Sequence, residues 1–212
     1  HVKANAGGAG IDQQSLNDVE ADLDGQLYKL WNRLSSGSYQ PPAVKQVVIA
    51  KSDGGERILG IPTVMDRVAQ TVVKHAIEAE LESHFHPDSY GYRPGRSAHD
   101  ALAVTRQRCW QQPWVVDVDI KGFFDCVCHE RLEELLRIRI SDPKLLSLIR
   151  RFLRAGVMIE GQRFATEDGV PQGASLSPLL ANVTSMTLRL ASRERREITA
   201  TTATLTQLPL SM

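Results

Sequence analysis

The sequence predicts a mixed α+β fold, because strands and helices follow one another without a strict β-α repeat. Three observations support this prediction. The apolar run at 114–120 alternates in polarity, which is typical of a strand. Apolar runs on both sides of an Asp-Gly-Gly sequence at 53–55 indicate a β-hairpin. The stretch at 68–81 has apolar residues at helical spacing. We therefore expect a small antiparallel sheet packed on helices.

The first half of the chain is predicted to hold a long helix, the hairpin and two further helices. Apolar spacing predicts a helix over 16–34, which ends at a Ser-Ser-Gly sequence. The hairpin begins with a β-rich run at 44–50. Asp66 is the expected N-cap of the second helix. A loop rich in proline and glycine follows, and the third helix is expected to begin at Ser97 or His99.

The second half is predicted to alternate in the same way. A helix over 129–138 is expected after the strand. Asp142 followed by proline indicates the N-cap and first residue of another helix, which stops at Gly156. A hairpin is expected over 157–165, and a further helix begins at Ser177-Pro178. Beyond 182 the sequence loses both turn signals and periodicity.

Composition restricts the class of protein. The chain has 212 residues, of which 42% are hydrophobic and 24% are charged, as in an ordinary globular protein. No apolar stretch approaches the roughly 20 residues that span a bilayer, and no signal-peptide pattern is present at the start. The three cysteines lack the spacing of a disulfide framework, which favours a reducing compartment. These features predict a cytoplasmic protein with no membrane partner.

The charge is balanced overall but uneven along the chain. The 25 basic and 25 acidic residues give a net charge of zero, which counts against a simple nucleic-acid binder. The segment 12–24 is acidic, whereas arginines gather at 93–108 and again at 137–154. A local basic track is therefore compatible with the composition. The alternative is that these arginines form a solvated helix face.

The segment 114–125 carries the clearest chemical signal. We interpret it as a buried strand with Asp117 and Asp119 on one face, opposite alternating apolar residues. A strand of this kind tolerates ionised carboxylates only on a face that is wet or binds metal. Two aromatic residues, Phe123 and Phe124, follow directly. Carboxylates that hold Mg²⁺ beside rings that shape a sugar pocket would suit nucleotidyl transfer.

Four motifs resemble reverse transcriptases of the group II intron type, in the order of that family. The sequence DIKGFFD at 119–125 resembles its first catalytic motif. The fingers segment is represented by RILGIPT and DRVAQ at 57–70, and the next block by YGYRPGRSAHDAL at 90–102. GVPQG and SPLLAN at 169–182 resemble a fourth block. The resemblance covers roughly residues 1 to 182.

The resemblance implies a right-hand polymerase with fingers and an incomplete palm. We expect fingers over 1–112, a partial palm over 113–182 and a divergent tail over 183–212, which is either frameshifted or disordered. The family pattern would continue with a Tyr-X-Asp-Asp strand, and this sequence does not contain one. The chain is therefore expected to be a truncated form that lacks two of the family's catalytic aspartates.

The resemblance also implies a metal site. Asp119 would be the catalytic metal ligand, and the backbone carbonyl of Ile120 a second contact to a pair of Mg²⁺ ions. Asp117 lies one pleat earlier, where a solvated or hydrogen-bonded acid is the simpler interpretation. Asp125 is expected to be a turn or capping residue. Two short His and Cys stretches, at 84–86 and 126–129, match no standard zinc spacing.

Nucleotide contacts are implied at four positions. Lys51 and Arg57 resemble a clamp for the triphosphate, since a lysine offers a point charge and an arginine a fork for phosphate oxygens. Phe124 matches the aromatic residue that excludes or tolerates the ribose 2′-hydroxyl. Gln172 resembles the residue that packs along the incoming nucleotide. The alternatives are ordinary hairpin charges for the first two and a core position for Phe124.

Arg93 and Arg96 are candidates for contacts to the RNA template, which would position a strand without reading its sequence. The expected partners are an RNA template, a DNA primer, deoxynucleoside triphosphates and intron RNA. The leading interpretation is an RNA-directed DNA polymerase that is inactive as this fragment. The alternative is a non-catalytic remnant that binds intron RNA as a splicing cofactor. An unrelated metal-dependent nuclease would need a second acidic cluster, which the sequence lacks.

Overall fold

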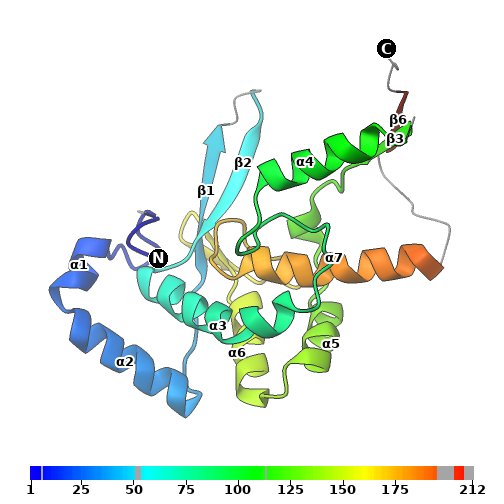
Figure 1. Ribbon diagram of the computed structural model, residues 1–212. Helices are drawn as coiled ribbons and strands as arrows, with labels where there is room; N and C mark the ends of the chain where they lie inside the picture. Colours follow the sequence, from blue (N-terminus) through cyan, green and yellow to red (C-terminus); the bar gives the residue numbers. More distant parts are fainter. Residues whose placement is uncertain (6, 51–53, 113, 195–202, 208–212) are drawn as a thin grey trace.

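A mixed sheet and a layer of helices form the body of the molecule (Figure 1), which was analysed as a computed structural model. The structure describes residues 1–5, 7–50, 54–112, 114–194 and 203–207. The predicted nucleotide contact Lys51 lies outside the described residues. The helices are α1 (Leu16–Ala21), α2 (Leu23–Ser36), α3 (Val64–Glu82), α4 (Ala98–Cys109), α5 (His129–Arg139), α6 (Pro143–Leu153) and α7 (Ser177–Glu194), with a 3-10 turn η1 (Phe123–Cys126).

The main sheet has the strand order β2-β1-β4-β5. Its strands are β1 (Val44–Ala50), β2 (Glu56–Ile61), β4 (Val157–Ile159) and β5 (Gln162–Phe164). Both predicted hairpins are present as antiparallel pairs. However, β1 and β4 pair in parallel, so the expectation of a purely antiparallel sheet is wrong. This pairing joins segments far apart in the sequence, and local turn signals carry no information about it.

Most helix boundaries follow from local capping chemistry. Ser97 caps α4 in a capping box with Asp100, and Asp142 accepts hydrogen bonds from the first amides of α6, as expected. Gly37 ends α2 in the left-handed conformation, with φ of 72°. The predicted helix over 16–34 is instead divided at Asp22, whose backbone is not helical.

Asp66 does not cap α3. The cap is Thr63, whose hydroxyl accepts from the Asp66 amide at 3.1 Å. Asp66 is buried, and its carboxylate accepts a hydrogen bond from the Tyr39 hydroxyl. The prediction placed the cap three residues late, because threonine and aspartate both favour the N-cap position of a helix.

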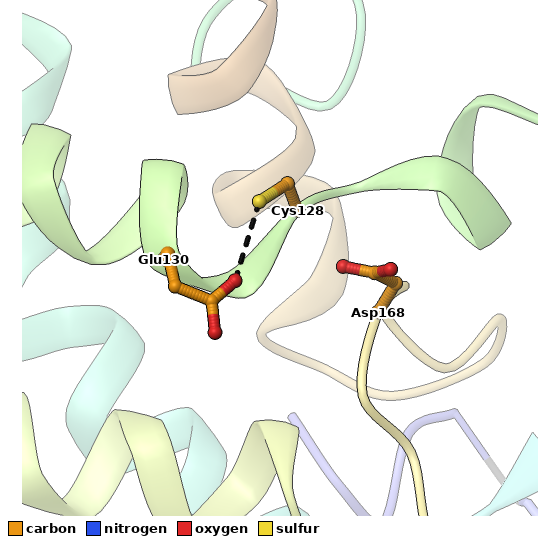
Figure 2. A group of neighbouring side chains, drawn as sticks. All are labelled: Cys128, Glu130 and Asp168. Carbon is orange, nitrogen blue, oxygen red and sulfur yellow. Dashed lines mark hydrogen bonds between the residues drawn. The ribbon is translucent and has the colours of Figure 1, made fainter.

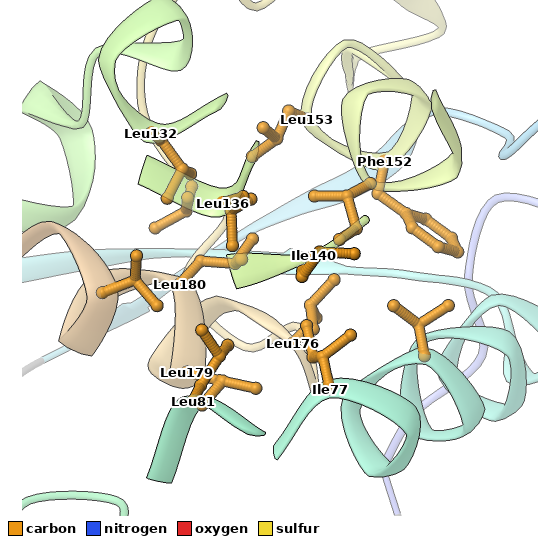
Figure 3. Packing of buried hydrophobic residues seen from close by; sticks show 14 of the residues in the cluster. Ile77, Leu81, Leu132, Leu136, Ile140, Phe152, Leu153, Leu176, Leu179 and Leu180 are labelled. Atoms are coloured by element: carbon orange, nitrogen blue, oxygen red, sulfur yellow. The ribbon is translucent and has the colours of Figure 1, made fainter. Parts of the chain in front are cut away.

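The core lies where α3, α5, α6 and α7 meet (Figure 3). Ile77 and Leu81 of α3 face Leu132 and Leu136 of α5, and Leu180 of α7 closes the cluster. Each of these side chains is at most 2% exposed. Complete burial of a leucine contributes about 1.5–3 kcal/mol. This core fixes α3 and the start of α7, which form two walls of the cavity described below.

The strand β3 (Trp114–Val118) is exposed, contrary to the prediction that it is buried. Trp114, Val116 and Val118 are 55%, 59% and 44% exposed. Among the described residues, β3 pairs only with β6 (Ala203–Gln207). In Figure 1 these two strands lie at the end of α4, apart from the main sheet. Polarity alternation correctly predicted the strand, but burial depends on a packing partner, and the described structure leaves the apolar face of β3 exposed.

The predicted boundary at 182 falls inside α7, which continues without a break to Glu194. No change in secondary structure marks the start of the proposed tail, and the strand β6 lies within it. The division into fingers, palm and tail therefore stays a prediction. Among the described residues, no helix combines the length and apolar character needed to cross a membrane.

The Asp66 carboxyl makes stability depend on pH. Burial raises its pKa from 3.8 to about 7, although hydrogen bonds from Tyr39 and Thr63 oppose this shift. The pKa of Asp66 is higher in the folded chain than in the unfolded chain. The contribution of this carboxyl to the free energy of unfolding is therefore fully present at a pH below the unfolded pKa. It is lost as the pH rises through the folded pKa.

We expect the free energy of unfolding of the wild-type chain to fall between about pH 5 and about pH 8. Asp66→Asn should show a smaller fall, since its amide accepts from Tyr39 without ionising. Urea titrations of both proteins at the two pH values measure this difference. Equal falls would show that Asp66 titrates normally in the folded chain.

Candidate functional site

A cavity of about 870 Å³ lies between β2, α3 and the loop that precedes α7. It collects residues from all four sequence motifs, including Tyr92, Arg93 and Pro94 of the block at 90–102. Arg57 comes from β2, Phe124 from η1 and Gln172 from the loop. These were predicted as nucleotide contacts from separate parts of the sequence, and the fold brings them to one cavity.

Backbone contacts hold Gln172 beside Arg57. The Gly60 amide of β2 donates to the Gln172 carbonyl at 2.8 Å. The Arg57 Nε then donates to the Gln172 side-chain oxygen at 3.3 Å. Gly173 follows with φ of 107°, and a Cβ at that position would lie 3.0 Å from the Gly60 carbonyl oxygen. Glycine at 173 is therefore required for the loop to approach β2 this closely.

A similar arrangement positions Phe124. The Val170 amide donates to the Phe124 carbonyl at 2.7 Å, which attaches the 3-10 turn to the same loop. A Cβ at Gly169 would lie 3.2 Å from that carbonyl oxygen. The Phe124 ring is half-buried and packs edge-on against Phe123. The motif at 119–125 and the motif at 169–173 thus form one structural unit.

Asp119 and Ile120 are not among the described residues that line this cavity. Asp119 directly follows β3 and is exposed, and Ile120 is 48% exposed. Water can therefore reach the Asp119 carboxylate, as an ionised carboxylate without a metal requires. The expected position of Asp119 beside the nucleotide contacts stays a prediction.

Arg93 lines the cavity but is anchored in the protein. Its guanidinium binds Glu82 at 2.6–3.2 Å, and Nη1 also donates to the carbonyls of His86 and Ser89. The side chain is 4% exposed and lies over the ring of Phe85. This geometry argues against an RNA contact by Arg93 in this conformation. Arg93 instead holds the loop that contains it.

Arg96 has the opposite environment. It is exposed, and its guanidinium lies 5.7 Å from the centre of the Tyr90 ring. Stacking on one face of an aromatic ring leaves the edge of the guanidinium open to a phosphate. Arg96 therefore stays a candidate for the template backbone.

Sequence reasoning missed the wall formed by α3. Four residues of α3 at helical spacing line the cavity, on a face beside the buried apolar residues of this helix: Thr71, Lys74, His75 and Glu78. The Lys74 Nζ lies 3.3 Å from the Glu78 carboxylate. The signal was present in the sequence, because these polar residues repeat at the same period as the apolar ones.

The described residues offer one group of side chains close enough to share a metal ion. The thiol of Cys128 and the carboxylates of Glu130 and Asp168 have ligand atoms within 4.8 Å of one another. Figure 2 shows the Cys128 thiol, which donates to Glu130 at 3.4 Å. All three residues are exposed and none lines the cavity.

The catalytic metal pair implied by the family needs several carboxylates in addition to substrate phosphates. No group of three potential ligands that includes Asp119 is present among the described residues. These residues therefore do not fit a pair of Mg²⁺ ions on their own.

Comparison with known proteins agrees with the family resemblance of the motifs. The sequence profile of the family "Reverse transcriptase (RNA-dependent DNA polymerase)" matches residues 49–199. The chain belongs to the reverse transcriptase family. The predicted relationship to group II intron proteins is also confirmed, as the following relatives show.

Two similar proteins are bacterial. Protein YkfC of Escherichia coli (strain K12) is 38% identical over 179 residues, which cover 82% of this chain and 47% of YkfC. The group II intron-encoded protein LtrA of Lactococcus lactis subsp. cremoris is 38% identical over 177 residues, 82% of this chain and 30% of LtrA. This chain therefore spans less than half of the length of either relative.

Two further comparisons extend the family. Nuclear intron maturase 4 of Arabidopsis thaliana, a mitochondrial protein, is 26% identical over 71% of this chain and 19% of that protein. A chain of the solved "Partial Cas6-RT-Cas1--Cas2 complex" is similar in structure, with a TM-score of 0.54 and 25% identity. The match covers 81% of this chain and 30% of that chain.

Proposed function

We propose that this chain forms the fingers and partial palm of an RNA-directed DNA polymerase of group II intron type, and that it is inactive alone. It binds an RNA template annealed to a DNA primer, with a deoxynucleoside triphosphate as the small substrate. The observation that carries this proposal is the convergence of Arg57, Phe124 and Gln172 on one cavity.

The side chains of the cavity suit these ligands. Arg57 is exposed and uses its Nε for Gln172, so its terminal nitrogens can face phosphate oxygens. Phe124 provides an aromatic edge against which a sugar would lie. Lys74 adds a positive charge on the opposite wall, and Glu78 is the one acidic residue among the described lining. Basic side chains therefore outnumber acidic ones in the described lining, although Lys74 pairs with Glu78 and Arg93 with Glu82.

The salt dependence of binding tests this proposal. Binding to a labelled primer–template is measured by fluorescence anisotropy over a range of salt concentrations. Each phosphate neutralised contributes about 0.7–0.9 to the slope of log affinity against log salt. We expect Lys74→Gln to reduce the slope by about one such contact.

Lys29→Gln is the matched control, because Lys29 is exposed on α2 and does not line the cavity. Its slope should equal that of the wild-type chain. A wild-type affinity that does not respond to salt would contradict the proposed function. An equal change of slope in Lys74→Gln and Lys29→Gln would show that the nucleic acid does not bind specifically at the cavity.

The alternative is a non-catalytic protein that binds intron RNA as a splicing cofactor. One observation favours it, since no triad of ligands that includes Asp119 exists in the described part of the chain. RNA binding without any DNA synthesis, combined with faster splicing of an intron RNA, would support this alternative. The proposal also includes Mg²⁺ as the cofactor of the intact family site and a cytoplasmic location.

A further inference from the structure

Tyr92 combines an unusual backbone with an exposed aromatic ring. Its φ angle is 57°, in the left-handed region that bulky residues rarely adopt. The side chain is 68% exposed and lines the 870 Å³ cavity. A strained conformation of this kind persists only where the surrounding structure imposes it, and such residues concentrate at binding sites.

Contacts on both sides of Tyr92 impose its conformation. On one side, the Gly91 carbonyl accepts a hydrogen bond from the Asn182 side chain at 2.9 Å. On the other, the Arg93 guanidinium is fixed by Glu82 and lies 5.3 Å from the centre of the Phe85 ring. Neither contact involves the Tyr92 ring, which therefore does not contribute to the core.

The surroundings of the ring indicate a ligand class. Lys74 and Arg57 line the same cavity and provide positive charge. An exposed aromatic ring beside cationic side chains is the common arrangement for single-stranded nucleic acid, because bases stack on the ring while phosphates meet the charges. An apolar peptide would not pair with the charges of Lys74 and Arg57, and a free phosphate would not stack on the Tyr92 ring.

We propose that Tyr92 is a stacking platform for an unpaired base of the nucleic-acid strand that enters the cavity. This inference rests on the proposed function and names one contact within it. The ring acts through its face, so its hydroxyl is not required. The base belongs to the strand rather than to the incoming nucleotide, whose contacts are Arg57, Phe124 and Gln172.

Anisotropy titrations with a primer–template that carries a single-stranded RNA overhang test this inference. Stacking on one aromatic ring accounts for about 1–3 kcal/mol per base, so Tyr92→Ala should weaken binding about fivefold to 150-fold. Tyr92→Phe should bind like the wild-type chain. Tyr28→Ala is the matched control, since Tyr28 is 64% exposed on α2 and lies outside the cavity lining.

Tyr92→Gly separates stacking from a structural role. Glycine adopts positive φ without strain, so this variant should have a higher melting temperature, by about 2–4 °C, than the wild-type chain. It should nevertheless lose affinity as Tyr92→Ala does. If the ring were merely structural, melting temperature and affinity would fall together.

The outcomes distinguish this inference from the proposed function. Salt-dependent binding by the wild-type chain with full affinity in Tyr92→Ala would leave the proposed function intact and overturn the stacking role. A parallel titration with a deoxynucleoside triphosphate alone identifies the source of the base. An effect of Tyr92→Ala on the free nucleotide but not on the overhang would also overturn the inference.

Discussion

Replacing Arg93 with alanine is expected to lower the free energy of unfolding by about 3 kcal/mol, the scale found when one partner of a buried ion pair is removed. The change leaves the Glu82 carboxylate without its partner and removes the hydrogen bonds that Arg93 donates to the carbonyls of His86 and Ser89. It also exposes one face of Phe85. Chemical denaturation of the purified variant measures the loss.

Arg96→Ala provides the matched control for this prediction. Arg96 lies three residues away on the same loop, but its side chain is exposed and its guanidinium lies over the Tyr90 ring. We expect its stability to change by less than about 0.5 kcal/mol, as for most surface substitutions. Its salt-dependent affinity for RNA should decrease instead. Similar losses of stability in both variants would show that Arg93 is not the anchor of the loop.

The helix caps and hairpins were predicted correctly in most cases, because they depend on residues that are neighbours in the sequence. Capping residues such as Ser97 and Asp142 act on amides within the next turn, so their sequence pattern determines the helix start. The hairpins follow from turn residues between apolar runs in the same way. Thr63 and Asp66 show the limit of this method, because two good capping residues in one segment cannot be ranked by type alone.

The prediction failed where an element depends on distant partners. The parallel pairing of β1 with β4 joins residues more than a hundred positions apart, as in the pair Val44 and Val157. The burial of β3 was inferred from its alternation, but alternation shows only that one face is apolar. Whether Val116 is covered depends on an element that packs against it, and in the described structure Val116 stays exposed.

The candidate site was predicted only in part, because motifs identify some of its residues while the roles of others depend on their surroundings in the fold. Arg57, Phe124 and Gln172 were found because each lies in a motif that resembles the family, and the fold brings them together. Arg93 looked equivalent to Arg96 in the sequence, since burial by Glu82 and Phe85 cannot be read from an Arg-Pro-Gly-Arg pattern. The strained Tyr92 needed coordinates, because a positive φ leaves no signature in a non-glycine residue. The α3 wall had a signal in the spacing of its polar residues, but that spacing does not show that the residues line a cavity.

Primer extension is expected to fail completely with this chain. An in-line attack on an α-phosphate needs two metal ions held by several carboxylates. Among the described residues, Asp119 belongs to no group of three potential metal ligands. Each loss of about 1.4 kcal/mol in transition-state stabilisation lowers the rate tenfold, so several missing ligands would reduce synthesis below detection.

The most direct test of the whole account measures binding and extension on the same primer–template. The purified chain is mixed with a labelled DNA primer on an RNA template, Mg²⁺ and all deoxynucleoside triphosphates, with a retroviral reverse transcriptase as the positive control. We predict a salt-sensitive complex in which the primer keeps its original length. A primer that lengthens above background, and that stops doing so in Asp119→Ala, would contradict the claim that this chain holds nucleic acid without a complete catalytic centre.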